Sequence, residues 1–169
     1  MKTTIALALI AASAAVASAG PKDNTWTQAK DAKWSPLDPA DKTGKGPQFT
    51  VVFGDAAKGP VGIILKVPPG FRPGPHTHTS DDYAVVISGS VHNFKSTAKD
   101  EKNTGPALTA GGSWFQPGAA PHDNECEKTS KDGCMLFVYM EKGFDFKPYA
   151  GDAKKPDAPK KDEKPAPKK

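Results

Sequence analysis

The chain lacks the patterns of a helical protein. No long window after Gly20 repeats apolar residues at three- and four-residue spacing, which is the signature of an amphipathic helix. The 169 residues also include 17 prolines and 16 glycines, which interrupt the sequence too often for long helices. These absences exclude a helical bundle and favour an all-β fold.

Several catalytic and binding signatures are also missing. The sequence has no phosphate-cradling Gly-rich loop, no G-x-S-x-G elbow and no His-Glu-x-x-His motif. The formal net charge of +4 comes from Lys2 and from residues 151–169, which hold seven lysines against four acidic residues. The remainder is close to neutral, so the sequence predicts no nucleic-acid partner.

Only one long apolar run is present, and it lies at the N-terminus. Lys2 precedes an alanine-rich stretch at residues 5–16, and Ala-Ser-Ala at 17–19 is a small-x-small cleavage site. The run is too short to span a membrane. We therefore predict a signal peptide at residues 1–19, cleavage near Ala19-Gly20, and a mature protein that is periplasmic or secreted and not transmembrane.

The rest of the chain divides by composition into three parts. Residues 20–47 form an N-terminal arm whose Trp26 and Trp34 are expected to pack on the domain or cover a sheet edge. Residues 48–150 form one domain. Residues 151–169 are Lys/Pro-rich and have no aromatic residue, so this tail is expected to be disordered and able to contact an acidic surface.

Strand signals are frequent within the domain. Short β-branched or aromatic runs alternate with Gly, Pro, Asn and Asp, which is typical of an antiparallel sandwich or barrel. The expected strands cover residues 48–53, 61–67, 83–88, 91–95, 113–116 and 135–141.

The two cysteines, Cys126 and Cys134, are eight residues apart. Between them Asp132-Gly133 is a strong turn signal, and an exported protein meets an oxidising compartment. We therefore predict a disulfide across a hairpin. Free thiols and thiolate metal ligands are the alternatives, because Cys126 is close to His122 in sequence.

Three of the four histidines belong to one pattern. Alternating strand residues share a face, so His76 and His78 point the same way, and Asp82 can reach the same space from the next strand. With His122, these side chains form a site for a divalent first-row metal. The alternative is a pair of polar side chains that are hydrogen-bonded at the mouth of a barrel.

These residues also carry a family resemblance. The sequence resembles the cupins, whose first motif is Gly-x5-His-x-His, three or four residues, Glu, six residues and Gly. Gly70, His76, His78, Asp82 and Gly89 match these spacings, with aspartate in place of glutamate.

The second cupin motif is Gly-x5-Pro-x-Gly-x2-His-x3-Asn. Gly111, Pro117 and His122 match it, whereas Ala119 and Cys126 replace its second glycine and its asparagine. Residues 34–39 and 143–146 are further similar to a group of small exported bacterial cupins of undefined function.

The resemblance implies a double-stranded β-helix, or jelly-roll barrel, and a metal inside it. The implied ligands are His76, His78, Asp82 and His122, and the implied metals are iron, manganese, zinc, nickel or copper, with iron slightly favoured. Because Asp82 is one methylene shorter than glutamate, it can instead bind through water or orient an imidazole. The site is then a three-histidine face, as in the thiol and diketone dioxygenases of the family.

The function expected from this pattern is a metal-dependent enzyme that acts on a small molecule, with dioxygenase-like chemistry favoured. Arg72 is a candidate for holding an anionic substrate, and Phe115 and Tyr139 are candidates for the pocket wall. A periplasmic module that binds or senses metal or a small ligand is the main alternative, and a metal-free ligand binder is another. The family also implies a homodimer.

Overall fold

The computed structural model describes residues 24–151. The predicted signal peptide and all but the first residue of the predicted tail lie outside the described residues. The chain divides into two units, one ending at Ala32 and one beginning at Lys33. In the first unit a single 3-10 turn, η1 (Ala29–Asp31), is closed by the amide of Asp31, which donates to the Gln28 carbonyl. Among residues 24–151, no helix is long and apolar enough to cross a membrane.

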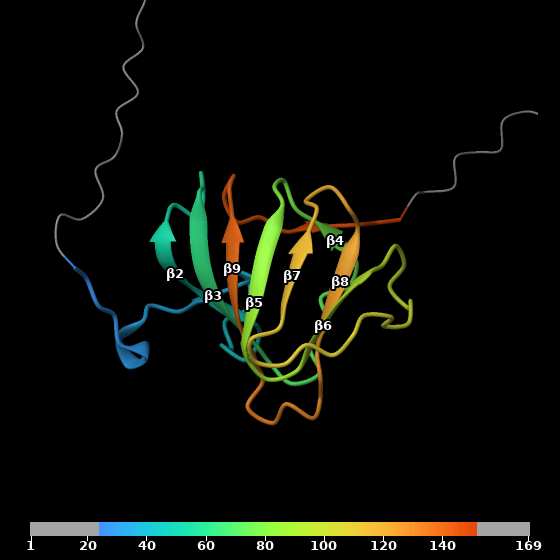
Figure 1. Cartoon of the computed structure of the whole chain (residues 1–169), viewed down its shortest axis with the longest axis horizontal. Helices are drawn as coiled ribbons and strands as arrows, with labels where there is room; N and C mark the ends of the chain where they lie inside the picture. The colour runs from blue at the N-terminus through green and yellow to red at the C-terminus, as the bar shows by residue number, and fades with distance from the viewer. Residues whose placement is uncertain (1–23, 152–169) are drawn as a thin grey trace, which may run out of the picture. The chain divides into compact units, whose positions relative to one another are not determined.

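The second unit contains a six-stranded antiparallel sheet (Figure 1). Its strands, in spatial order, are β1 (Ser35–Pro36), β2 (Gln48–Gly54), β3 (Val61–Val67), β9 (Cys134–Met140), β5 (Asp82–Ser88) and β7 (Ser113–Gln116). Along β9 every second side chain is buried, starting at Cys134, so one face of the sheet lies in the core. β1 pairs with β2, so residues preceding the domain cover the edge of this sheet.

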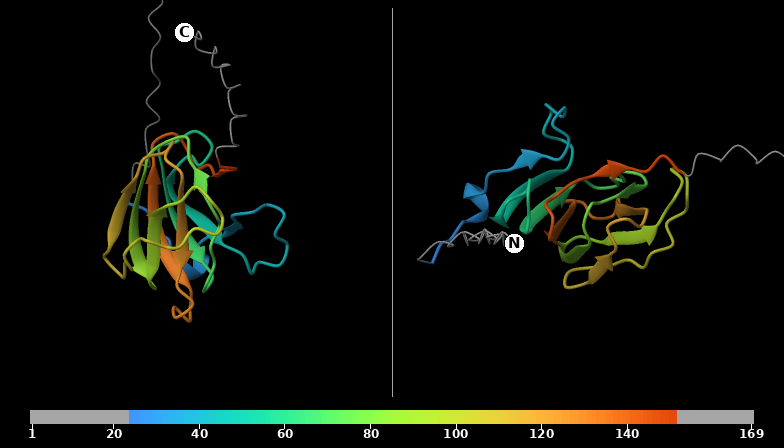
Figure 2. Two further views of the ribbon diagram at one scale, coloured as in Figure 1. Left: turned by 90° about the vertical axis from the view of Figure 1, so that its right-hand side faces the viewer. Right: turned by 90° about the horizontal axis from the view of Figure 1, so that it is seen from above.

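A four-stranded sheet forms the second layer (Figure 2). Its order is β10 (Lys147–Pro148), β4 (His76–Thr77), β8 (His122–Cys126) and β6 (Val91–Lys95). β4 and β10 have only two residues each, so much of the backbone around the first two motif histidines is loop.

The hydrophobic core lies between the two sheets. β6 and β8 contribute Val91 and Cys126, and all other members of the cluster come from the larger sheet. The buried cluster consists of Val61, Ile63, Ala84, Val86, Val91, Cys126, Cys134, Leu136, Val138 and Met140. The predicted all-β jelly-roll architecture is thus confirmed, and its inner face is available to carry a site.

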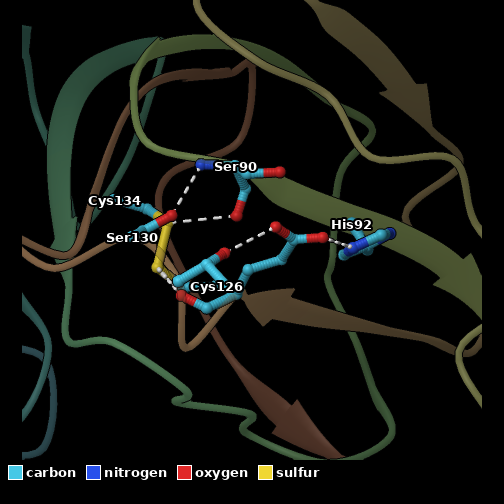
Figure 3. Close-up of a disulfide and its surroundings, with 7 residues drawn as sticks. Ser90, His92, Cys126, Ser130 and Cys134 are labelled. Carbon is cyan, nitrogen blue, oxygen red and sulfur yellow. Dashed lines mark hydrogen bonds and ion pairs between the residues drawn. A yellow bond between two sulfur atoms is a disulfide. The ribbon is translucent and has the colours of Figure 1, made fainter.

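A disulfide joins the two layers (Figure 3). Cys126 lies on β8 in the smaller sheet and Cys134 lies on β9 in the larger one. The prediction that the disulfide crosses a hairpin is therefore wrong, because the strands that carry the two cysteines belong to different sheets. Gly89 allows this close packing: its φ is +84°, and a Cβ there would lie 2.8 Å from Cys134 Sγ.

Candidate metal centre

The ends of two paired strands bring three histidines together. His76 begins β4, His122 begins β8, and the two residues are direct partners in the antiparallel register. His78 follows β4, and its amide donates to the Gly118 carbonyl at 2.8 Å. One ligand nitrogen from each histidine lies within 4.8 Å of the other two, and all three residues are buried. This group is called the histidine cluster below.

Backbone carbonyls fix the tautomer of each ring. A carbonyl only accepts, so each Nδ1 carries the hydrogen and each Nε2 keeps its lone pair in the neutral imidazole. The pairs are His76 with Gly74 at 2.8 Å, His78 with Asp145 at 2.5 Å, and His122 with Ala120 at 3.1 Å. This arrangement orients metal-binding imidazoles in proteins, because the hydrogen-bonded nitrogen holds the ring while the other nitrogen binds.

Burial keeps the histidine cluster neutral. Burial, followed by the neighbouring His122, lowers the pKa of His76 to about 3. Burial likewise lowers the pKa of His122 to about 4 and lowers the pKa of His78. Neutral imidazole is the form that binds transition metals, so at neutral pH the cluster has the protonation state that a metal requires.

Asp82 lies beside the histidine cluster and outside the group of three. Its Oδ2 is 3.5 Å from Nε2 of His78. Its buried Oδ1 has no hydrogen-bond partner in the part of the chain that the structure describes. Burial raises the pKa of Asp82 to about 7; Asp81 adds to the shift and the indole of Trp114 partly offsets it. An unpartnered buried carboxylate oxygen beside three neutral imidazoles fits a divalent transition metal. Direct ligation by Asp82 remains a prediction.

The segment after β9 secures two members of the histidine cluster. The ring of Phe146 stacks on His76, with centroids 4.5 Å apart and planes inclined by 27°. The carbonyl of Asp145 accepts from His78, while its carboxylate accepts from the Thr79 amide at 2.9 Å. In the sequence, residues 143–146 show only a family likeness, and no pattern there predicts a role in the site.

Arg72 does not have its expected role of holding an anionic substrate, because its guanidinium is already paired within the domain. Its Nε donates to Oδ2 of Asp123 at 2.5 Å, and Asp123 is fully buried. Oδ1 of the same carboxylate accepts from the Gly74 amide at 3.1 Å. Asp123 follows His122 and holds the loop that leads into His76, so this ion pair positions the cluster. No sequence pattern indicated that Asp123 supports the site.

Phe115 and Tyr139 also lie elsewhere than expected. Phe115 is 52% exposed on the outer face of the larger sheet, and both rings contact Tyr83, with centroids 5.0 and 6.3 Å from it. Their strand neighbours Trp114 and Val138 line the cavity instead. The prediction placed the wrong residues of β7 and β9 on the inner face, because aromatic content alone does not distinguish the inner face of a strand from its outer face.

The fourth histidine is outside the cluster. Nδ1 of His92 lies 2.9 Å from the Gly105 carbonyl, and Nε2 lies 2.9 Å from Oε1 of Glu127. Burial alone would lower its pKa, but the carbonyl of Gly105 and the carboxylates of Glu127 and Glu125 raise it overall. His92 thus faces two acceptors, which favours the imidazolium form.

Comparisons with known proteins support the fold. The family model described as Domain of unknown function (DUF4437) matches residues 26–167. No curated protein matches the chain. KdgF from a Halomonas species is 16% identical with a TM-score of 0.51, and the match covers 71% of this chain and 96% of that chain.

Two other solved structures have similar scores. A cupin described as RmlC-like from Shewanella frigidimarina is 15% identical with a TM-score of 0.51, covering 72% of this chain and 93% of that chain. A variant of oxalate decarboxylase from Bacillus subtilis is 18% identical with a TM-score of 0.50, covering 75% of this chain and 32% of that chain. At these identities the matches establish a cupin fold and no activity.

Proposed function

The chain belongs to the family described as Domain of unknown function (DUF4437), and we propose that it is an exported, metal-dependent cupin enzyme that acts on a small molecule. One observation carries this proposal. One ligand nitrogen from each ring of the histidine cluster lies within 4.8 Å of the other two, and each Nδ1 is hydrogen-bonded to a carbonyl, so each Nε2 keeps its lone pair. Neutral imidazoles with converging lone pairs are a donor set for a divalent transition metal.

Iron is the first candidate for this metal, ahead of manganese, zinc, nickel and copper. Three imidazoles leave coordination positions open for other ligands. A ferrous ion held there would supply redox chemistry with dioxygen, which is the basis for favouring a dioxygenase. The protein's own part is to hold the imidazoles, to exclude bulk water from a cavity of about 80 Å³, and to place Asp82 beside His78.

The alternative is a module that binds or senses metal or a small ligand without turnover. The same cluster would serve it, so the discriminating observation is consumption of a substrate. The protein loaded with ferrous iron would be screened for oxygen uptake with neutral alcohols, thiols and diketones. Uptake that is lost in His122→Ala supports the enzyme, whereas saturable ligand binding without uptake supports the binding module.

We also propose export to the periplasm or beyond. The N-terminal pattern supports it, and the disulfide between Cys126 and Cys134 is of a kind that persists in oxidising compartments. Fractionation of bacterial cells that produce the full chain, with mass spectrometry of the product, tests this. A product that begins at Gly20 outside the cytoplasm is expected, and a full-length cytoplasmic product would contradict it.

A homodimer is the proposed assembly, supported by the outer face of the larger sheet. Rings of Phe53, Tyr139, Tyr83 and Phe115 follow one another across β2, β9, β5 and β7, with centroid separations of 5.0 to 6.3 Å. Apolar surface of this kind is a typical protein contact, and a two-fold axis pairs it with itself. Sedimentation should give a dimer that dissociates in Tyr83→Arg; a monomeric wild type would contradict the proposal.

Metal analysis tests the central part of the proposal. The protein would be purified without an affinity histidine tag and analysed by elemental mass spectrometry beside the double variant His76→Ala/His78→Ala. Near-stoichiometric metal that is lost from a folded variant is the expected result. Wild-type protein that stays metal-free after reconstitution with ferrous, manganous and zinc ions would overturn the metalloenzyme and leave a metal-free binder.

A further inference from the structure

Two members of the histidine cluster, His76 and His78, line a cavity. Within residues 24–151, neither lysine nor arginine lines it, and its polar lining groups besides these two rings are Asp82, Asn124 and the indole N–H of Trp114. Its remaining walls are apolar and come from both sheets. An anionic group buried among these apolar walls, away from the histidines and any metal that they hold, would lose its hydration without gaining a counter-charge, at a large cost.

Three cations that are sequence neighbours of residues lining the cavity are already engaged. Arg72 pairs with Asp123 and also donates to the Glu101 carbonyl at 2.8 Å. Lys66 lies over the Trp34 ring, with Nζ 3.7 Å from the ring centroid. Lys147 pairs with Asp145 at 3.2 Å and donates to the Thr79 hydroxyl at 2.6 Å. These contacts leave none of the three side chains poised to bind a carboxylate in the cavity.

The cavity adjoins an outer groove of about 1200 Å³. The same six side chains line both spaces, and all of them are proline, leucine or phenylalanine. They come from three stretches of chain: the segment before β2, the loop before β4 and the segment after β9. This apolar collar consists of Leu37, Pro47, Phe71, Pro73, Phe144 and Phe146.

The two volumes determine the shape of a fitting ligand. A cavity of about 80 Å³ is smaller than the ~150 Å³ cavity that holds a benzene ring, so only a head of a few atoms fits beside the histidines. The rest of the molecule must occupy the collar and the groove. The charged residues that line the groove are three acids, Asp38, Asp41 and Asp145, and one lysine, Lys45, which is a poor match for an anion.

We infer that the ligand is an uncharged, mostly apolar small molecule with one terminal oxygen or sulfur donor, whose head reaches the histidine cluster and whose body lies in the apolar collar. This inference rests on the proposed function for the role of the donor atom. The collar itself is a property of the chain and can be tested without metal.

The test compares two thiols that share a donor and an aromatic ring and differ in the charge of the body: phenylmethanethiol and 4-(mercaptomethyl)benzoate, whose carboxylate is too far from its sulfur to bind the same metal. The full chain is loaded with cobalt(II), whose absorption band with a bound thiol gives one readout, and calorimetry on loaded and metal-free protein gives the second. Phenylmethanethiol should bind at least about tenfold more tightly than 4-(mercaptomethyl)benzoate. Phe71→Ala should weaken phenylmethanethiol about tenfold, because a large apolar contact is lost.

Two further variants make the result decisive. Phe115→Ala removes an equal side chain on the outer face and should leave the affinity within about twofold. Leu37→Ser tests the collar independently if Phe71→Ala does not fold. Equal or tighter binding of 4-(mercaptomethyl)benzoate, or no response to either collar variant, would overturn the ligand class even if cobalt binds in full.

The metal part of the proposed function can fail independently of the ligand class. If the protein takes up no cobalt, calorimetry on the metal-free protein still decides the ligand class. Binding of phenylmethanethiol that is weakened by a collar variant supports the inference while the metal proposal falls. Absence of such binding overturns both.

Discussion

His92 and the histidine cluster show how the same side chain acquires opposite pKa shifts in one domain. Both ring nitrogens of His92 face acceptors, and its pKa is raised. In the cluster each Nδ1 has a carbonyl acceptor, one nitrogen of each ring lies within 4.8 Å of the other two histidines, and burial lowers all three pKa values. The acceptors around each ring, together with its burial, decide the direction in which its pKa moves.

β6 and β8 carry both environments side by side. In the antiparallel register Lys95 lies opposite His122, and His92 lies opposite Glu125 three residues further along β8. The two kinds of site are therefore separated by a few residues of one strand pair. Substitutions that disturb one site and spare the other can separate their roles.

The largest expected effect comes from the ion pair that supports the histidine cluster. Asp123→Ala leaves the Arg72 guanidinium and the Gly74 amide without their buried partner, so the free energy of unfolding should fall by about 3–5 kcal/mol. Chemical denaturation measures this change. Glu127→Ala removes the partly exposed carboxylate partner of His92 and should lower the free energy of unfolding by less than about 1 kcal/mol. Equal losses in the two variants would contradict the account.

The next effect concerns metal affinity. His122→Ala should weaken zinc binding at least about 100-fold in a competition titration, because loss of a ligand exceeds the 10–100-fold cost of losing a residue that only orients one. His92→Ala is the matched control and should change the affinity by less than about twofold. If His92→Ala weakened zinc as strongly as His122→Ala, the metal would not reside in the cluster.

The disulfide connects β8, the strand that carries His122, to β9 in the larger sheet. The double variant Cys126→Ser/Cys134→Ser should lose about 2–3 kcal/mol of unfolding free energy, since the bond closes a short loop in the unfolded chain. Thermal unfolding with and without reductant should show the same loss in the wild type. A wild type whose midpoint does not change on full reduction would show that the bond does not stabilise the packing of the sheets.

The smallest effect is the pH dependence contributed by His92. Because its folded pKa is raised above the usual 6.5, its stabilising contribution is complete below about that pH and is lost as the pH rises through the folded pKa. The difference in unfolding free energy between wild type and His92→Gln should therefore shrink from mildly acidic to mildly alkaline pH. A difference that grew with pH would contradict the imidazolium assignment.

Most of the fold could be predicted because its long strands are rich in β-branched and aromatic residues. β3 and β9 are examples, and alternation along β9 places one face in the core. β8 was not predicted because His-Asp-Asn-Glu-Cys contains no β-branched or aromatic residue. Pairing with β6 makes it a strand, which is a tertiary effect that a local pattern does not contain.

The candidate site was only partly predictable. The His-x-His spacing and the second motif identified His76, His78 and His122. The carbonyl that orients His78 could not be found in this way, since it belongs to Asp145, 67 residues further along the chain. Arg72 was expected to hold a substrate for the same reason. Its partner Asp123 is 51 residues further along the chain, and no local pattern connects the two residues.

X-ray absorption spectroscopy of the zinc-loaded protein shows whether the metal binds in the histidine cluster, with His92→Ala as the matched control. Three imidazole nitrogens are expected at about 2.0–2.1 Å from zinc, and the control should give the same spectrum. His122→Ala should reduce the imidazole count to two. A zinc site with one imidazole or none, or a spectrum that changes in His92→Ala and not in His122→Ala, would contradict a metal centre in the histidine cluster.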